Sequence, residues 1–165
     1  MDALSEEFVD QTWEDFASYT PEQAYTEGLA VGARQPELLA FILEMTEDLD
    51  QDIKELAVYM VYVIHHMFQK AYGKNIDKIS SDEIIECYEE NEKIIENLEG
   101  IHEKFFERIA RVQMSSQPFV VRYVVETLFE AEQDDDPVLH GEEDMGYLFL
   151  LMKTVIDVLN LKTDA

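Results

Sequence analysis

The sequence predicts an all-α bundle of six or seven helices within a single domain, residues 1–165. Apolar residues recur three and four positions apart throughout the chain, as they do along one face of a helix. No run of four or more residues alternates between apolar and polar side chains in the way that a half-buried strand requires. With 47% hydrophobic residues, a chain of this length can bury one core but not two large ones.

The first half of the chain is expected to form four helices, at about residues 3–17, 20–27, 36–46 and 51–72. A capping box that opens at Thr20 starts the second of them, with a glutamine three residues after the hydroxyl. We expect this helix to be short, because Gly28 and Gly32 follow and glycine weakens a helix interior. Gly73 is expected to end the fourth helix.

The second half is expected to form a long helix at about 80–113, opened by a capping box at Ser80, and two more at about 117–132 and 142–160. As one straight rod the long helix would measure about 50 Å, whereas a globule of this size is about 40 Å across. It must therefore protrude or bend, and Gly100 is the natural place for a bend.

Two segments of the chain resemble each other. Residues 35–44 and 117–126 share Gln, Pro and Glu at the same offsets, with apolar residues of the same type between them. The helices that follow also align along one face: Asp52, Leu56, Met60, Val63 and Ile64 against Asp144, Leu148, Met152, Val155 and Ile156. This predicts an internal duplication of a helical hairpin, with repeat-like units 35–72 and 117–160 packed about a pseudo-twofold axis. The alternative is that any two amphipathic helices align passably at such spacing.

The charge of the chain excludes several kinds of partner. With 37 acidic and 12 basic residues the formal net charge is −25, which repels phosphate backbones and anionic membrane surfaces. We therefore expect no direct binding of nucleic acid or membrane, whereas a basic protein partner would be attracted. The longest apolar stretch, residues 56–68, is too short to span a bilayer. No signal-peptide pattern opens the sequence, so a cytoplasmic protein is expected.

Four residues form a candidate polar pocket: His65, His66, Lys153 and Asp157. The two histidines are adjacent on a helix and diverge by about 100°, so they cannot chelate one ion together. In the alignment of the two hairpins His65 stands opposite Asp157, and a pseudo-twofold axis would bring them close. The alternative is that the histidines are ordinary core or rim residues and that Lys153 and Asp157 pair on an exposed edge.

Acidic residues of the long helix form a candidate metal site: Glu83, Glu86, Glu96, Glu99 and His102. Glu99 and His102 have the Glu-x-x-His spacing of di-iron bundles, but the second such motif is missing. The paired glutamates are similar to those that hold Mg²⁺ in the all-helical nucleotide pyrophosphohydrolases. Glutamate is frequent enough here to produce the spacing by chance on a solvated face. No cluster of Lys or Arg is present to receive a triphosphate, and we expect no cofactor.

Together these observations favour a non-enzymatic, acidic helical interaction module that self-associates as a homo-oligomer. The reason is the long helix at 80–113, whose apolar residues at 105–112 extend beyond the length that one globule covers. A basic protein partner is the second expected interaction. The alternative function is a magnesium-dependent enzyme similar to the nucleotide pyrophosphohydrolases, which would use glutamates of the long helix.

Overall fold

The computed structural model describes residues 3–73, 76–99, 116–139 and 142–163, and over this part of the chain it confirms an all-α bundle without strands. Seven helices are described there: α1 (Glu6–Ala17), α2 (Pro21–Arg34), α3 (Pro36–Met45), α4 (Gln51–Tyr72), α5 (Ser81–Glu99), α7 (Pro118–Gln133) and α8 (Glu142–Thr163). Residues 100–115, which include Gly100 and the second half of the predicted long helix, lie outside the described residues. None of the described helices is long and apolar enough to cross a membrane.

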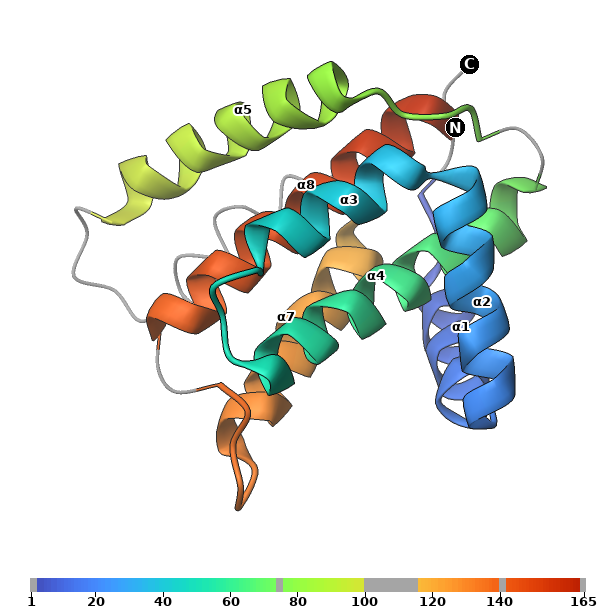
Figure 1. Ribbon diagram of the computed structural model, residues 1–165, viewed down its shortest axis with the longest axis horizontal. Coiled ribbons are helices and arrows are strands. Elements are labelled where there is room, and N and C mark those ends of the chain that lie inside the picture. The colour runs from blue at the N-terminus through green and yellow to red at the C-terminus, as the bar shows by residue number, and fades with distance from the viewer. Residues whose placement is uncertain (1–2, 74–75, 100–115, 140–141, 164–165) are drawn as a thin grey trace.

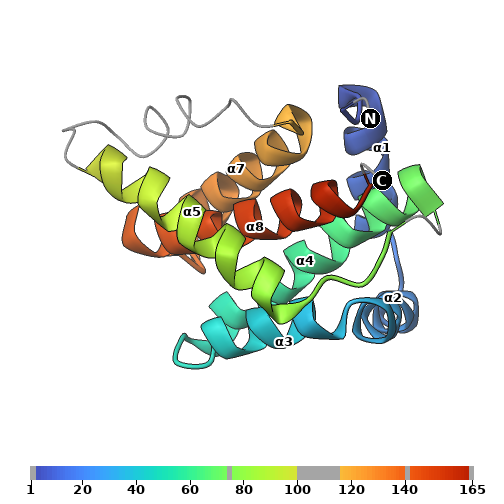
Figure 2. The same cartoon turned by 90° about the horizontal axis from the view of Figure 1, so that it is seen from above.

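Two helices, α4 and α8, lie side by side at the centre of the bundle (Figures 1 and 2). Every residue from 148 to 156 of α8 is buried, because α4, α5 and α7 all pack against this helix. A helix that is covered on all sides needs apolar residues around its whole circumference, and α8 has them.

The remaining helices are arranged around the central pair in a regular way. α3 returns against α4, and α7 returns against α8, so that each pair forms a hairpin. α1 packs on α4 and α7, whereas α5 packs on α8 and α3. Figure 2 shows α1 and α3 on opposite sides of the central helices. α1 and α5, which we call the outer helices, therefore each bridge the two hairpins, whereas α2 packs on α3 and α4.

Both predicted capping boxes are present. At α2 the hydroxyl of Thr20 accepts from the backbone N–H of Gln23, whose side chain accepts from the backbone N–H of Thr20. Ser80 and Glu83 make the same reciprocal bonds at α5, at 3.2 and 3.0 Å. Gly73, with φ of +63°, ends α4 as expected, since this conformation favours glycine.

The prediction of a short second helix is wrong. α2 continues through both glycines as far as Arg34. Gly28 is buried against the ring of Tyr62 on α4, and a Cβ at this position would lie 2.9 Å from that ring. The glycine therefore serves a close contact between two helices, and packing outweighs its cost of about 1 kcal/mol to helix formation.

Candidate functional site

Two buried glutamines, each at the start of one helix, bind the backbone just before the start of another. Gln35 and Gln117 are the N-cap residues of α3 and α7, with similar backbone angles (φ −133°, ψ 62° and φ −128°, ψ 68°). The side-chain oxygen of Gln35 accepts from the backbone N–H of Ile79, and that of Gln117 accepts from the backbone N–H of Leu4, both at 2.9 Å. Each of these N–H groups belongs to the residue just before the capping serine of an outer helix, α5 or α1.

The two pairs of helices joined in this way, α3 with α5 and α7 with α1, each also contain a contact between two aromatic rings. Phe41 of α3 contacts Tyr88 of α5, with ring centroids 5.7 Å apart. Tyr123 of α7 contacts Trp13 of α1 at 6.5 Å. Phe41 and Tyr123 both stand six positions after the capping glutamine, and Tyr88 and Trp13 both stand eight positions after the capping serine. The α3–α5 and α7–α1 pairs are thus built alike.

A groove of about 350 Å³ lies between α3 and α5; we call it the α3–α5 groove. It is lined by Glu37, Ala40, Phe41, Glu44, Met45, Ser81, Ile84, Ile85, Tyr88, Glu89 and Glu92. The lining is apolar and aromatic where it meets the core, and four glutamates surround it. None of the lining residues is basic. Burial, followed by the Glu92 carboxylate, raises the pKa of Tyr88 to about 12, so this phenol keeps its proton at neutral pH.

The corresponding surface of the α7–α1 pair is occupied by an arginine of the chain itself. Nη2 of Arg122 lies 2.9 Å from Oε1 of Glu6, and its Nε lies 3.7 Å from Oε1 of Glu126. Its guanidinium carbon is 5.2 Å from the ring centre of Phe119. The arginine therefore joins α7 to α1 through charge and through contact with a ring.

No family model, curated protein or solved structure matches this chain.

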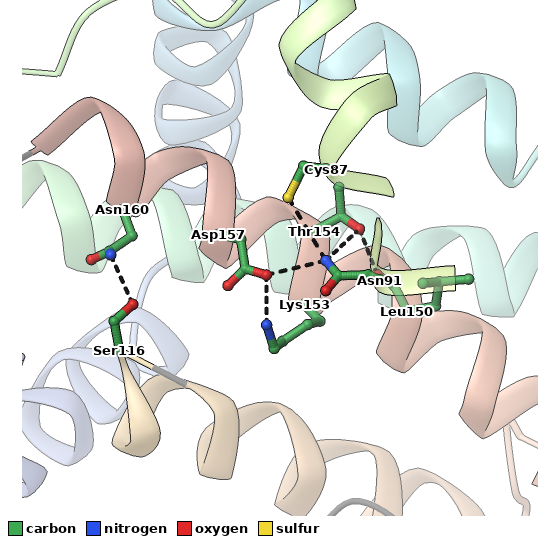
Figure 3. Close-up of polar contacts among 8 residues, drawn as sticks. All are labelled: Cys87, Asn91, Ser116, Leu150, Lys153, Thr154, Asp157 and Asn160. Carbon is green, nitrogen blue, oxygen red and sulfur yellow. Dashed lines mark hydrogen bonds and ion pairs between the residues drawn. The ribbon is translucent and has the colours of Figure 1, made fainter. Parts of the chain in front are cut away.

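Lys153 and Asp157 of the candidate polar pocket pair with each other on α8, with 2.5 Å between Nζ and Oδ2 (Figure 3). Asn91 of α5 donates from Nδ2 to the same carboxylate oxygen at 3.1 Å and to the hydroxyl of Thr154 at 3.3 Å. These bonds join α5 to α8 and compensate for burying the lysine. Burial raises the pKa of the adjacent Cys87 thiol to about 12, so this cysteine is not a thiolate nucleophile at neutral pH.

The histidines lie in a different environment. His66 contacts Oε2 of Glu27 through Nδ1 and the hydroxyl of Tyr19 through Nε2, both at 3.3 Å. His65 is buried, and within the described part of the chain neither of its ring nitrogens has a hydrogen-bond partner. Burial, together with the positive charges of Arg34 and His66, lowers its pKa to about 4. Among the described residues, no hydrogen bond or ion pair joins either histidine to the pair on α8.

The candidate metal site lies only partly within the described residues. Glu83 pairs with Nζ of Lys162 at 2.8 Å and caps α5, and the bond to the lysine holds its pKa below the usual range. Glu86 is exposed. The side chains of Glu96 and Glu99, and all of His102, lie outside the described residues. Within the described part of the chain, no three His, Cys, Asp or Glu residues are grouped to hold a metal ion.

Proposed function

We propose that this protein is a non-enzymatic, acidic interaction module that binds a basic segment of a partner protein in the α3–α5 groove. The observation that carries this proposal is the combination of an apolar lining with four glutamates and no basic residue. When an apolar side chain of the partner is buried there, each Å² of apolar surface removed from water contributes about 25 cal/mol to the free energy of binding. The carboxylates favour positive residues beside it and disfavour acidic partners.

The test uses a fluorescein-labelled synthetic peptide of fifteen residues, helical, with leucines on one face and lysines beside them. Fluorescence anisotropy measures its affinity for the wild type and for the double variant Glu44→Lys, Glu89→Lys. We expect this variant to bind at least about tenfold more weakly, which corresponds to about 1.4 kcal/mol. We also expect the affinity of the wild type to fall as the salt concentration rises, because charge pairs at a surface are screened.

The matched control carries the same change of charge on α1, as Glu7→Lys, Glu14→Lys; both residues are exposed. Figure 2 places α1 on the other side of the bundle from α3. If both double variants weaken binding equally, the peptide recognises net charge rather than the groove. Failure of the peptide to bind the wild type, or binding that ignores salt, would contradict the proposal.

We also infer that the chain contains an internal duplication. Its support is the repeated pair of contacts: each capping glutamine bonds the residue before a capping serine, and each outer helix adds an aromatic ring at the same offset. The proposed repeat thus includes α1 and α5, which occupy equivalent positions, in addition to the hairpins at 35–72 and 117–160.

Self-association remains a prediction, because its reason, the apolar residues at 105–112, lies outside the described residues. Multi-angle light scattering at micromolar concentration is expected to give twice the chain mass of 19.2 kDa. A mass of one chain would overturn it. The magnesium-dependent alternative gains no support from the described side chains, since Glu83 is engaged by Lys162.

A further inference from the structure

The two matched helix pairs differ at several positions, and one of these differences bears directly on what the groove can bind. Arg122 stands five residues after Gln117, and the residue five positions after Gln35 is Ala40. Arg122 lies against α1, as described above. Ala40 is an exposed residue that lines the α3–α5 groove. The α3–α5 pair therefore has a hollow at the position where the α7–α1 pair has a guanidinium.

One of the three partners of Arg122 has an equivalent in the groove. Glu44 stands nine residues after Gln35, as Glu126 stands nine residues after Gln117, and Glu126 is a partner of Arg122. Three further carboxylates, from Glu37, Glu89 and Glu92, line the groove from both helices. The groove also contains the rings of Phe41 and Tyr88, the counterparts of Tyr123 and Trp13. The other two partners of Arg122 have no such equivalent, because Ser81 stands at the position of Glu6 and Glu37 at the position of Phe119.

We infer that the α3–α5 groove binds an arginine side chain of the partner protein, in the place that Arg122 occupies in the α7–α1 pair. This inference rests on the proposed function and names the residue that the groove recognises. A guanidinium forms two parallel bonds to a carboxylate and stacks on aromatic rings, whereas the ammonium of lysine is a strongly hydrated point charge. A groove with carboxylates on both helices and two rings beneath them suits the former.

The first test compares two versions of the synthetic peptide that differ only in the central residue, arginine or lysine. We expect the wild type to bind the arginine peptide about fivefold more tightly, because only the guanidinium can pair and stack at once. Equal affinity for the two peptides would overturn the inference. It would leave the proposed function intact, provided that the double variant of the groove still binds more weakly.

The second test places an arginine of the chain itself in the α3–α5 groove. Ala40→Arg places an arginine at the position equivalent to Arg122, and because Ala40 is exposed and arginine is a good helix former, we expect the variant to fold. It should bind the arginine peptide at least about tenfold more weakly than wild type. The matched control is Ala17→Arg, with the same change of charge at an exposed position of α1.

The outcomes of the second test separate the two proposals. Loss of binding in Ala40→Arg alone supports the inference. Equal loss in Ala40→Arg and Ala17→Arg would contradict both proposals, because it would show that binding depends only on net charge. Full binding by Ala40→Arg would overturn the inference, and circular dichroism of each variant identifies a change that comes from unfolding.

Discussion

Replacing His65 with leucine is expected to raise the free energy of unfolding relative to wild type, and to do so by about 2 to 3 kcal/mol more at about pH 4.5 than at about pH 7.5. The pKa of His65 is about 4 in the folded protein, against about 6.5 when exposed. Its folded-state pKa is depressed, so the unfolded chain binds the proton first. The stability that the wild type owes to a neutral His65 is therefore fully present above about pH 6.5 and is lost as the pH falls toward the folded-state pKa of about 4.

Urea denaturation of wild type and His65→Leu at both pH values measures this difference. The titrating carboxylates are common to the two proteins, so their contribution cancels in the comparison. Met67→Leu, at a fully buried neighbouring position, is the control, and the difference between its stability and that of the wild type should be the same at both pH values. A difference between wild type and His65→Leu that is the same at both pH values would show that His65 accepts a proton freely in the folded protein.

Gln35→Met and Gln117→Met are each expected to lower the free energy of unfolding by about 3 kcal/mol. Methionine preserves most of the volume but cannot accept a hydrogen bond of comparable strength, so the buried N–H of Ile79 or of Leu4 loses its partner. Gln35 also donates to the backbone oxygen of Asp77, and Gln117 donates to Asn160. The two losses should add in the double variant, because the hydrogen bonds described here for Gln35 and Gln117 go to different partners.

The control for these variants is Gln133→Met, which changes an exposed glutamine at the end of α7. Its effect should lie within about 0.5 kcal/mol of zero, as for most surface substitutions. Chemical denaturation of the wild type, the two single variants, the double variant and the control measures these differences in the free energy of unfolding. If Gln35→Met lowered the free energy of unfolding no more than the control does, the prediction would be wrong. The buried bond to Ile79 would then contribute nothing measurable to stability.

Most of the fold could be predicted because local sequence signals mark where several of its helices begin and end. Thr20 and Ser80 open capping boxes, and Gly73 closes α4. The error at α2 has a tertiary cause: Gly28 is a poor helix former in isolation, but only the structure reveals that Tyr62 lies against it. Similarly, α8 continues past 160 to Thr163, where Lys162 pairs with a glutamate of α5.

The candidate site could be predicted only in fragments. The pairing of Lys153 with Asp157 follows from their spacing on one helix. That Asn91 joins this pair, and that His66 pairs with Glu27 instead, depends on helices that are distant in sequence. The groove was missed because Phe41 and Tyr88 look like ordinary core residues. The available signal was that Ala40 stands at the position of Arg122 in two similar segments, which also differ in type at Glu37 and Phe119.

The bond between Gln117 and the backbone of Leu4 has a consequence for synthesis. The beginning of the chain obtains its last hydrogen-bond partner from a residue made more than a hundred positions later. While the ribosome is still building α5, Gln117 has not yet been made, so this bond and the packing of α1 on α7 form only later. The packing of α1 on α4 involves residues that are made earlier. The complete contacts of α1 therefore join segments that are far apart in the chain, and such contacts are slow to form.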